Sequence, residues 1–150
     1  MSDVEILALV NKDAGTADAA CEALGNAGGF RVERIAPSEL ADRVRGALAR
    51  GERRILVAGG DGSIATAAAA MRGKACELAI LPGGTLNHLA QDLGLPEDLT
   101  EAAKVATGER TRCIDAAEPD VGRVRERKCG CGVQKPLELI ALPPGRAAEA

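Results

Sequence analysis

The sequence has almost no aromatic side chains: 150 residues include one Phe, Phe30, and neither Trp nor Tyr. This absence excludes a surface that binds single-stranded nucleic acid by stacking bases on aromatic rings. A net charge of −3 argues further against a general nucleic-acid binder, which would be basic. We therefore expect no nucleic-acid partner, and a core filled by Ala, Leu, Val and Ile.

Long hydrophobic runs are also missing. The longest apolar stretches have the length of a strand, so no segment predicts a membrane-spanning helix. The N-terminal residues MSDVEILALVNKD lack the basic start and apolar run of a secretory signal. Without such a signal, the odd set of five cysteines is expected to be reduced in a cytoplasmic protein. These are Cys21, Cys76, Cys113, Cys129 and Cys131.

The sequence does contain an alternation of strand-like and helix-like segments. Strands are predicted at 4–10, 30–36, 54–58, 77–81, 111–117 and 137–142. Helices are predicted to begin at Thr16, at Pro37, within the glycine-rich segment after residue 58, near Leu86 and at Thr100. Short links between alternating elements predict an α/β fold of three layers, a mostly parallel sheet with helices on both faces. A change of composition near Pro119 predicts a domain over 1–118 and a tail over 119–150 without a recognisable domain.

Three glycine-containing turns follow predicted strands whose carboxyl ends should meet at one edge of the sheet. We name them the first turn (11–15, NKDAG), the second turn (59–63, GGDGS) and the third turn (82–87, PGGTLN). Each leads into a helix, whose first N–H groups lack partners and favour an anion. Glycine lets the backbone approach a phosphate closely. One such turn alone is an ordinary tight turn, whereas three converging turns favour a phosphate-binding site.

Asp61 lies inside the second turn, and two roles are open for it. Beside a phosphate, its charge calls for a cation such as Mg²⁺ or for a place near the transferred group. Alternatively, Asp61 stabilises the N-terminus of the helix that follows. Residues 60–65 also fit the dinucleotide pattern G-x-G-x-x-A. That fit is weak, because the next strand ends at Pro82 and carries its acid, Glu77, at the near end.

The segments GGDGS (59–63) and LPGGTLNHLAQDLGLPEDL (81–99) together resemble the diacylglycerol kinase catalytic domain, in its bacterial lipid kinase branch. The family pattern is GGDG[ST], followed by P-x-G-T-x-N-x-x-A-x-x-L-G-x-P. The resemblance covers about residues 4–118. The family's first motif, Asn-Pro-x-Ser-Gly, reads NKDAG here; it keeps Asn11 and Gly15 but lacks the Pro and the Ser.

The resemblance implies a Rossmann-like domain of the lipid and NAD kinase type, with ATP and Mg²⁺ as cofactors. The γ-phosphoryl group would pass to a hydroxyl of diacylglycerol or a related lipid. A nucleotide and a lipid at a membrane surface would then be the partners, with the protein cytoplasmic or peripheral at the inner membrane surface. Asp61 would be the catalytic residue near the phosphates. The cofactor-binding residues implied are Asn11, Gly59, Gly60, Gly62, Ser63, Gly83, Gly84, Thr85 and Asn87.

Two side chains near these motifs carry weaker expectations. His88 falls at a position where the family varies, and a lone His on a first helical turn is expected to be solvated or capping. Cys129 and Cys131 lack a second ligand pair at the spacing of a zinc site, so no metal ligand is expected.

The resemblance ends near residue 118. Family members continue into a second, β-rich domain that completes the catalytic machinery, and RERKCGCGVQKPLELIALPPG is unlike it. We therefore expect a truncated or reading-frame-altered C-terminus. A second hypothesis follows, an ATP-binding module without catalysis, and an NAD kinase-like enzyme, which shares the GGDG turn, is the third. The short basic run over 123–128 is expected to be solvated, and no feature indicates an oligomer.

Overall fold

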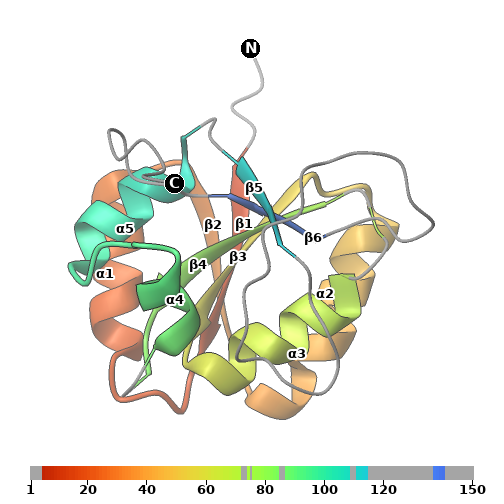
Figure 1. The fold of residues 1–150 in the computed structure, drawn as a ribbon. Helices are drawn as coiled ribbons and strands as arrows, with labels where there is room; N and C mark the ends of the chain where they lie inside the picture. Colours follow the sequence, from red (N-terminus) through yellow and green to blue (C-terminus); the bar gives the residue numbers. More distant parts are fainter. Residues whose placement is uncertain are drawn as a thin grey trace.

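A computed structural model describes residues 5–71, 74, 76–84, 87–108, 111–114 and 137–140. These residues form a six-stranded sheet with helices on both faces (Figure 1), which confirms the predicted α/β class. The strands are β1 (Ile6–Asn11), β2 (Phe30–Ile35), β3 (Arg54–Gly59), β4 (Glu77–Pro82), β5 (Thr111–Ile114) and β6 (Leu137–Ile140). The helices are α1 (Ala17–Ala27), α2 (Leu40–Ala49), α3 (Asp61–Met71), α4 (His88–Asp92) and α5 (Leu99–Ala106), with a 3₁₀ turn, η1 (Pro37–Glu39), before α2.

The strands are ordered β2-β1-β3-β4-β6-β5 across the sheet. Strand β5 is antiparallel to β6, and every other neighbouring pair is parallel, as the sequence predicted. Strand β6 lies between β4 and β5, so residues 137–140 belong to the same sheet as the rest of the chain. The division of the chain at residue 118 stays a prediction.

The central strands are buried on both faces, which explains their near-continuous apolar sequences. Alternate residues face opposite layers. Leu7 and Leu9 of β1 pack in the layer of α2 and α3, whereas Ala8 and Val10 pack in the layer of α1 and α5. Figure 1 shows these two pairs of helices on opposite faces of the sheet. The largest fully buried side chains are all Leu, Ile or Met, which agrees with the expected core.

The helix start predicted at Thr16 is confirmed in position, and the start predicted at Thr100 is displaced. Thr16 directly precedes α1, but its side chain makes no capping hydrogen bond. Thr100 does not begin a helix, because α5 starts at Leu99 and Asp98 caps it by accepting a hydrogen bond from the N–H of Glu101 at 2.9 Å. The Thr16 hydroxyl donates to the carbonyl of Gly83 instead, and Asp98 takes the capping role expected near Thr100.

Two of the five cysteines have described side chains, and both are free thiols: Cys21 and Cys76. Burial raises the pKa of the Cys76 thiol to about 11, so this side chain is protonated at neutral pH and packs as a small apolar group. The other three cysteines lie where side chains are outside the described part of the chain. None of the described helices has the length and apolarity to cross a membrane.

Candidate functional site

The three turns do converge. Strands β1, β3 and β4 are parallel neighbours, so Asn11, Gly59 and Pro82, the last residues of these strands, lie at the same edge of the sheet. The N–H of Gly83 donates to the carbonyl of Gly59 at 2.9 Å, which joins the third turn to the second. The hydroxyl of Thr16, next to the first turn, donates to the carbonyl of Gly83 at 2.7 Å. The sequence therefore predicted the meeting point of the turns correctly.

The glycines of the second and third turns lie against one another. A Cβ atom on Gly84 would be 2.5 Å from the Cα of Gly60, and one on Gly83 would be 3.1 Å from the nitrogen of Gly59. A Cβ atom on Gly59 would be 2.8 Å from the Cβ of Ser63. From the sequence, these glycines were expected to make room for a phosphate. The structure gives a different physical reason, since side chains here would force the turns apart.

Asn87 closes the third turn on itself. Its side-chain oxygen accepts from the N–H of Gly84, and its side-chain nitrogen donates to the carbonyl of Gly84, both at 2.9 Å. Asn87 adopts a left-handed φ of 50°, a conformation that Asn tolerates better than most residues. The N–H groups of Gly83 and Gly84 are thus engaged inside the chain. Thr85, the remaining cofactor-binding residue predicted in this turn, lies outside the described residues.

Open donors remain at the start of α3. The first helical hydrogen bond runs from the N–H of Ile64 to the carbonyl of Gly60 at 3.1 Å, so the N–H groups of Gly62 and Ser63 precede it. These two N–H groups donate to no group in the described part of the chain. A Cβ atom on Gly62 would meet nothing within 4 Å, so the backbone here faces open space. The start of α3 therefore combines accessible donors with the positive end of a helix dipole.

Asp61 is the first residue of α3, and its carboxylate reaches the start of α4. Its Oδ2 atom accepts a hydrogen bond from the backbone N–H of His88 at 3.2 Å. The Nδ1 atom of the His88 ring lies 3.8 Å from the same oxygen, and the imidazole is 66% exposed. This pairing was missed by the sequence analysis, although both residues begin helices that follow neighbouring parallel strands. Asp61 directly precedes Gly62 in the chain, and its position at the start of α3 is compatible with either role left open for it.

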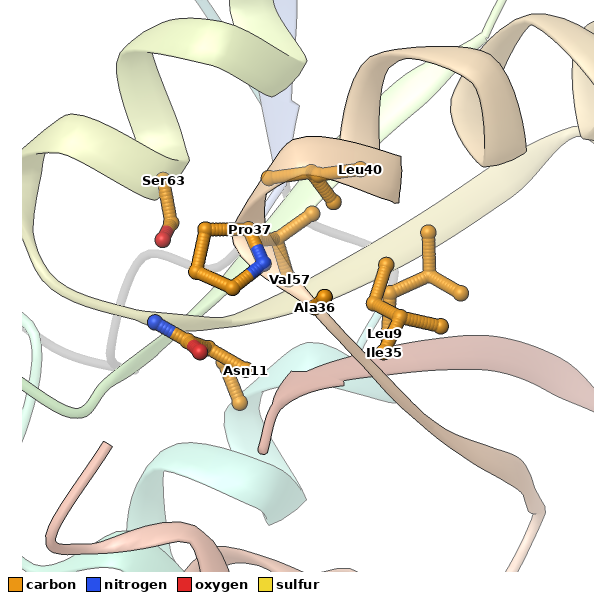
Figure 2. A pocket seen from close by; sticks show the side chains of 9 residues that line it. Leu9, Asn11, Ile35, Ala36, Pro37, Leu40, Val57 and Ser63 are labelled. Carbon is orange, nitrogen blue, oxygen red and sulfur yellow. The ribbon is translucent and has the colours of Figure 1, made fainter. Parts of the chain in front are cut away.

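A shallow depression adjoins these donors, at the end of β2 (Figure 2). Asn11 and Ser63 line it at one end, and apolar side chains including Leu9, Ile35 and Pro37 line the rest. It is open to solvent and encloses no space for even a water-sized molecule. The contribution of β2 and η1 was missed, although a fourth parallel strand beside β1 must also end at this edge. The depression offers an apolar surface beside polar groups.

A metal cage is not formed by this arrangement. Within the described ranges, no three His, Cys, Asp or Glu side chains gather closely enough to hold a metal ion. Asp61 is the acidic side chain that the second turn contributes, and its carboxylate is 35% exposed. One carboxylate together with substrate phosphates is a common way for proteins to hold Mg²⁺.

Comparisons with known proteins agree with these observations. The family described as "Diacylglycerol kinase catalytic domain" matches residues 5–118. A curated relative from Klebsiella pneumoniae, "Probable lipid kinase YegS-like", is 43% identical over 65 residues, which cover 42% of this chain and 22% of the relative. A relative of the same name from Cronobacter sakazakii is 38% identical over 84 residues, which cover 53% of this chain and 26% of the relative.

A solved structure is also similar. The crystal structure of a diacylglycerol kinase from Bacillus anthracis superposes with a TM-score of 0.64 at 25% identity. The match covers 75% of this chain and 41% of that protein. The chain thus spans about a quarter of the length of its curated relatives and about two fifths of the solved structure.

Proposed function

This chain belongs to the diacylglycerol kinase catalytic domain family, and we propose that it forms the ATP-binding part of a lipid kinase. The proposed reaction transfers the γ-phosphoryl group of ATP to a hydroxyl of diacylglycerol or a related lipid. ATP supplies the phosphoryl group and Mg²⁺ neutralises its charge, so the protein contributes mainly positioning and electrostatic stabilisation. This phosphoryl transfer would take place in the cytoplasm, at the surface of the inner membrane.

One observation carries the proposal: at the end of the strands where the three turns meet, the N–H groups of Gly62 and Ser63 donate to no group in the described part of the chain. N–H groups at the start of an eleven-residue helix, α3, suit the phosphates of a nucleotide. The Ser63 hydroxyl adds a donor, and Asn11 lines the same depression as Ser63. In this proposal Gly83, Gly84 and Asn87 support the shape of the site and do not contact the nucleotide. The polar groups of Gly84 and Asn87 are already bonded to each other.

We propose that the Asp61 carboxylate would contact Mg²⁺. Its carboxylate lies at the first residue of α3, next to the donors that would contact the phosphates. A carboxylate at this place would repel phosphate unless a cation lay between them, which supports a contact with Mg²⁺. The backbone N–H of His88 would hold the carboxylate in that orientation.

A second candidate function is an ATP-binding module that lacks catalysis. It is supported by the open donors of Gly62 and Ser63, which suit phosphates whether or not a phosphoryl group is transferred. An NAD kinase-like reaction has less support, because the family that matches residues 5–118 is that of the diacylglycerol kinases.

Two measurements separate these outcomes. Thermal unfolding is followed in increasing ATP, with and without Mg²⁺, for wild type and Asp61→Asn. A binder gains stability with the logarithm of ligand excess, about 2.7 kcal/mol at a hundredfold excess over Kd. Asp61→Asn should keep binding ATP but lose most of the effect of Mg²⁺. No shift at millimolar ATP would refute ATP binding.

The second measurement is transfer of radiolabelled phosphate from ATP to vesicles that contain diacylglycerol. Labelled phosphatidate would support the kinase, and its loss in Asp61→Asn would tie the activity to this site. ATP binding without any labelled lipid would favour the module.

A further inference from the structure

The hydroxyl of Thr16 makes its hydrogen bond to a distant part of the chain. It directly precedes α1, where a Thr hydroxyl usually accepts a hydrogen bond from the first helical turn. Here no such bond forms, and the hydroxyl instead donates to the carbonyl of Gly83 at 2.7 Å. The contact is partly buried and joins residues 67 positions apart. Thr16 therefore contributes to the arrangement of the turns rather than to its own helix.

The contact continues through Gly83 to the second turn. The N–H of Gly83 donates to the carbonyl of Gly59 at 2.9 Å, so this residue is held from both sides. The fit leaves little room, because a Cβ atom on Gly83 would lie 3.1 Å from the Thr16 hydroxyl and 3.1 Å from the nitrogen of Gly59. Gly59 is followed by Gly60, whose carbonyl accepts the first hydrogen bond of α3. A line of contacts thus runs from the start of α1 to the start of α3.

We propose that Thr16 is a positioning residue of the nucleotide site. Through Gly83, its hydroxyl fixes where the second turn presents the open N–H groups of Gly62 and Ser63. This inference rests on the proposed function. Thr16 acts through another residue, since its donor is already bonded to Gly83 and is not available to a ligand.

The test uses two substitutions at Thr16 and one elsewhere. Thr16→Val keeps the shape of the side chain and removes the donor, whereas Thr16→Ser keeps the donor. The matched control is Thr107→Val, because the Thr107 hydroxyl donates to the carbonyl of Lys104 at the same distance, 2.7 Å, at the end of α5. Affinities for AMP, ADP and ATP are measured by calorimetry, well below the unfolding temperature of every variant.

Loss of the Thr16 hydrogen bond should weaken ATP binding about fivefold, as expected for one ordinary hydrogen bond. In the proposed site the β- and γ-phosphates lie at the Gly62 and Ser63 donors, so the loss should be smaller for AMP, which lacks both phosphates. Thr16→Ser should restore most of the affinity, and Thr107→Val should match wild type. A Thr16→Val protein that binds ATP as wild type does, or that loses AMP and ATP affinity equally, would overturn the inference.

Hydrogen exchange supplies a readout that needs no ligand. Thr16→Val should increase exchange in peptides covering residues 59–64, and Thr16→Ser should not. Unchanged protection in Thr16→Val would also overturn the inference. If Thr16→Val fails to fold, Thr16→Ala takes its place. If wild type binds no ATP, the proposed function fails first, and the exchange result then reports separately on whether Thr16 orders the second turn.

Discussion

At the scale of single residues, glycines a few positions apart in this site meet different physical demands. Gly84 packs directly on the backbone of Gly60, where any side chain would collide. Gly62 has open space beside it, and nothing in the described chain comes within 4 Å of where a Cβ atom would lie. Gly84 is therefore needed for the fold, whereas a need for glycine at Gly62 would have to come from a ligand.

Alanine substitutions at Gly84 and Gly62 should separate these demands. Gly84→Ala places a Cβ atom 2.5 Å from the Cα of Gly60 and should lower the free energy of unfolding by about 1–3 kcal/mol. Gly62→Ala should leave stability unchanged or raise it by up to about 1 kcal/mol, because Ala is the better helix former. The ATP affinity of Gly62→Ala should fall about tenfold. The added methyl group would keep the phosphates from approaching the backbone, and the loss corresponds to roughly one hydrogen bond.

Urea unfolding measures the stabilities, and calorimetry measures the ATP affinities. The two variants serve as controls for each other, because each should change one quantity more than the other. Equal ATP affinity in Gly62→Ala and wild type would mean that the phosphates do not approach the start of α3.

The sequence allowed the residues of the site to be predicted better than the reasons for them. Glycine in a turn is compatible with a ligand, with a positive φ or with a close backbone neighbour, and the chain order does not distinguish these. The hydroxyl of Thr16 has the same limitation. Its local partner, the start of α1, is visible in the sequence, whereas Gly83 becomes its partner only because β1 and β4 end at the same edge.

At the scale of elements, the start of α5 illustrates how close the sequence-based prediction came. Thr100 was expected to begin this helix, and the cap is Asp98, two positions earlier. Both residue types are good caps, so composition alone could not choose between them. The choice depends on the backbone, because Asp98 has the extended conformation of a capping residue, with φ of −67° and ψ of 123°.

Removing each side chain tests the assignment of the cap. Asp98→Ala should lower the free energy of unfolding by about 1 kcal/mol, because the N–H of Glu101 loses its acceptor. Thr100→Ala, inside the first turn of α5, should change stability by less than about 0.5 kcal/mol. Chemical denaturation of both variants in the same buffer provides the comparison. A larger loss in Thr100→Ala than in Asp98→Ala would restore the original prediction.

Element types were predicted more successfully than element lengths. The buried strands β1, β3 and β4 have unbroken apolar sequences, which is a strong local signal. The helix predicted to begin near Leu86 rests on apolar residues with helical spacing, the last of which is Leu93. In the structure, α4 has five residues and ends at Asp92. Leu93 and Leu95 are buried all the same. The core therefore requires apolar residues just after α4 as well, so the apolar pattern continues past the end of the helix.

At the scale of the whole molecule, the two ends of the parallel strands have different roles. The carboxyl ends of β1, β3 and β4 carry the candidate site, and Arg54, the first residue of β3, lies at the opposite end of the strands. Its guanidinium donates to the Glu77 carboxylate at 3.1 Å and to the carbonyls of Ala106 and Gly108 at 2.9 and 2.8 Å. This one side chain connects β3, β4 and the end of α5.

Local patterns could not reveal this connection or the order of the strands. The sequence predicted a mostly parallel sheet, but it could not show that β6 lies between β4 and β5. Strand order depends on which apolar faces meet after the chain has crossed between layers, and no short segment of sequence records that. The same holds for Arg54 and Gly108, which are brought together by the packing of α5 on the sheet.

Because Arg54 and the candidate site lie at opposite ends of the strands, substitution of Arg54 should affect stability and not ATP binding. Lysine keeps the positive charge but lacks the planar fork that reaches several acceptors at once, so Arg54→Lys leaves at least one partly buried carbonyl without its donor. The free energy of unfolding should fall by about 1–3 kcal/mol. Arg53→Lys is the matched control, since the Arg53 side chain is exposed and makes no described contact.

Affinity for ATP should be the same in wild type, Arg54→Lys and Arg53→Lys, because the binding turns lie at the far ends of the strands. Urea titrations report the loss of stability, and calorimetry at a temperature where all three proteins are folded reports the binding. Weaker ATP binding in folded Arg54→Lys would mean that the two ends of the strands are coupled through β3. In that case the start of this strand, and not only its end, would have to be counted as part of the nucleotide site.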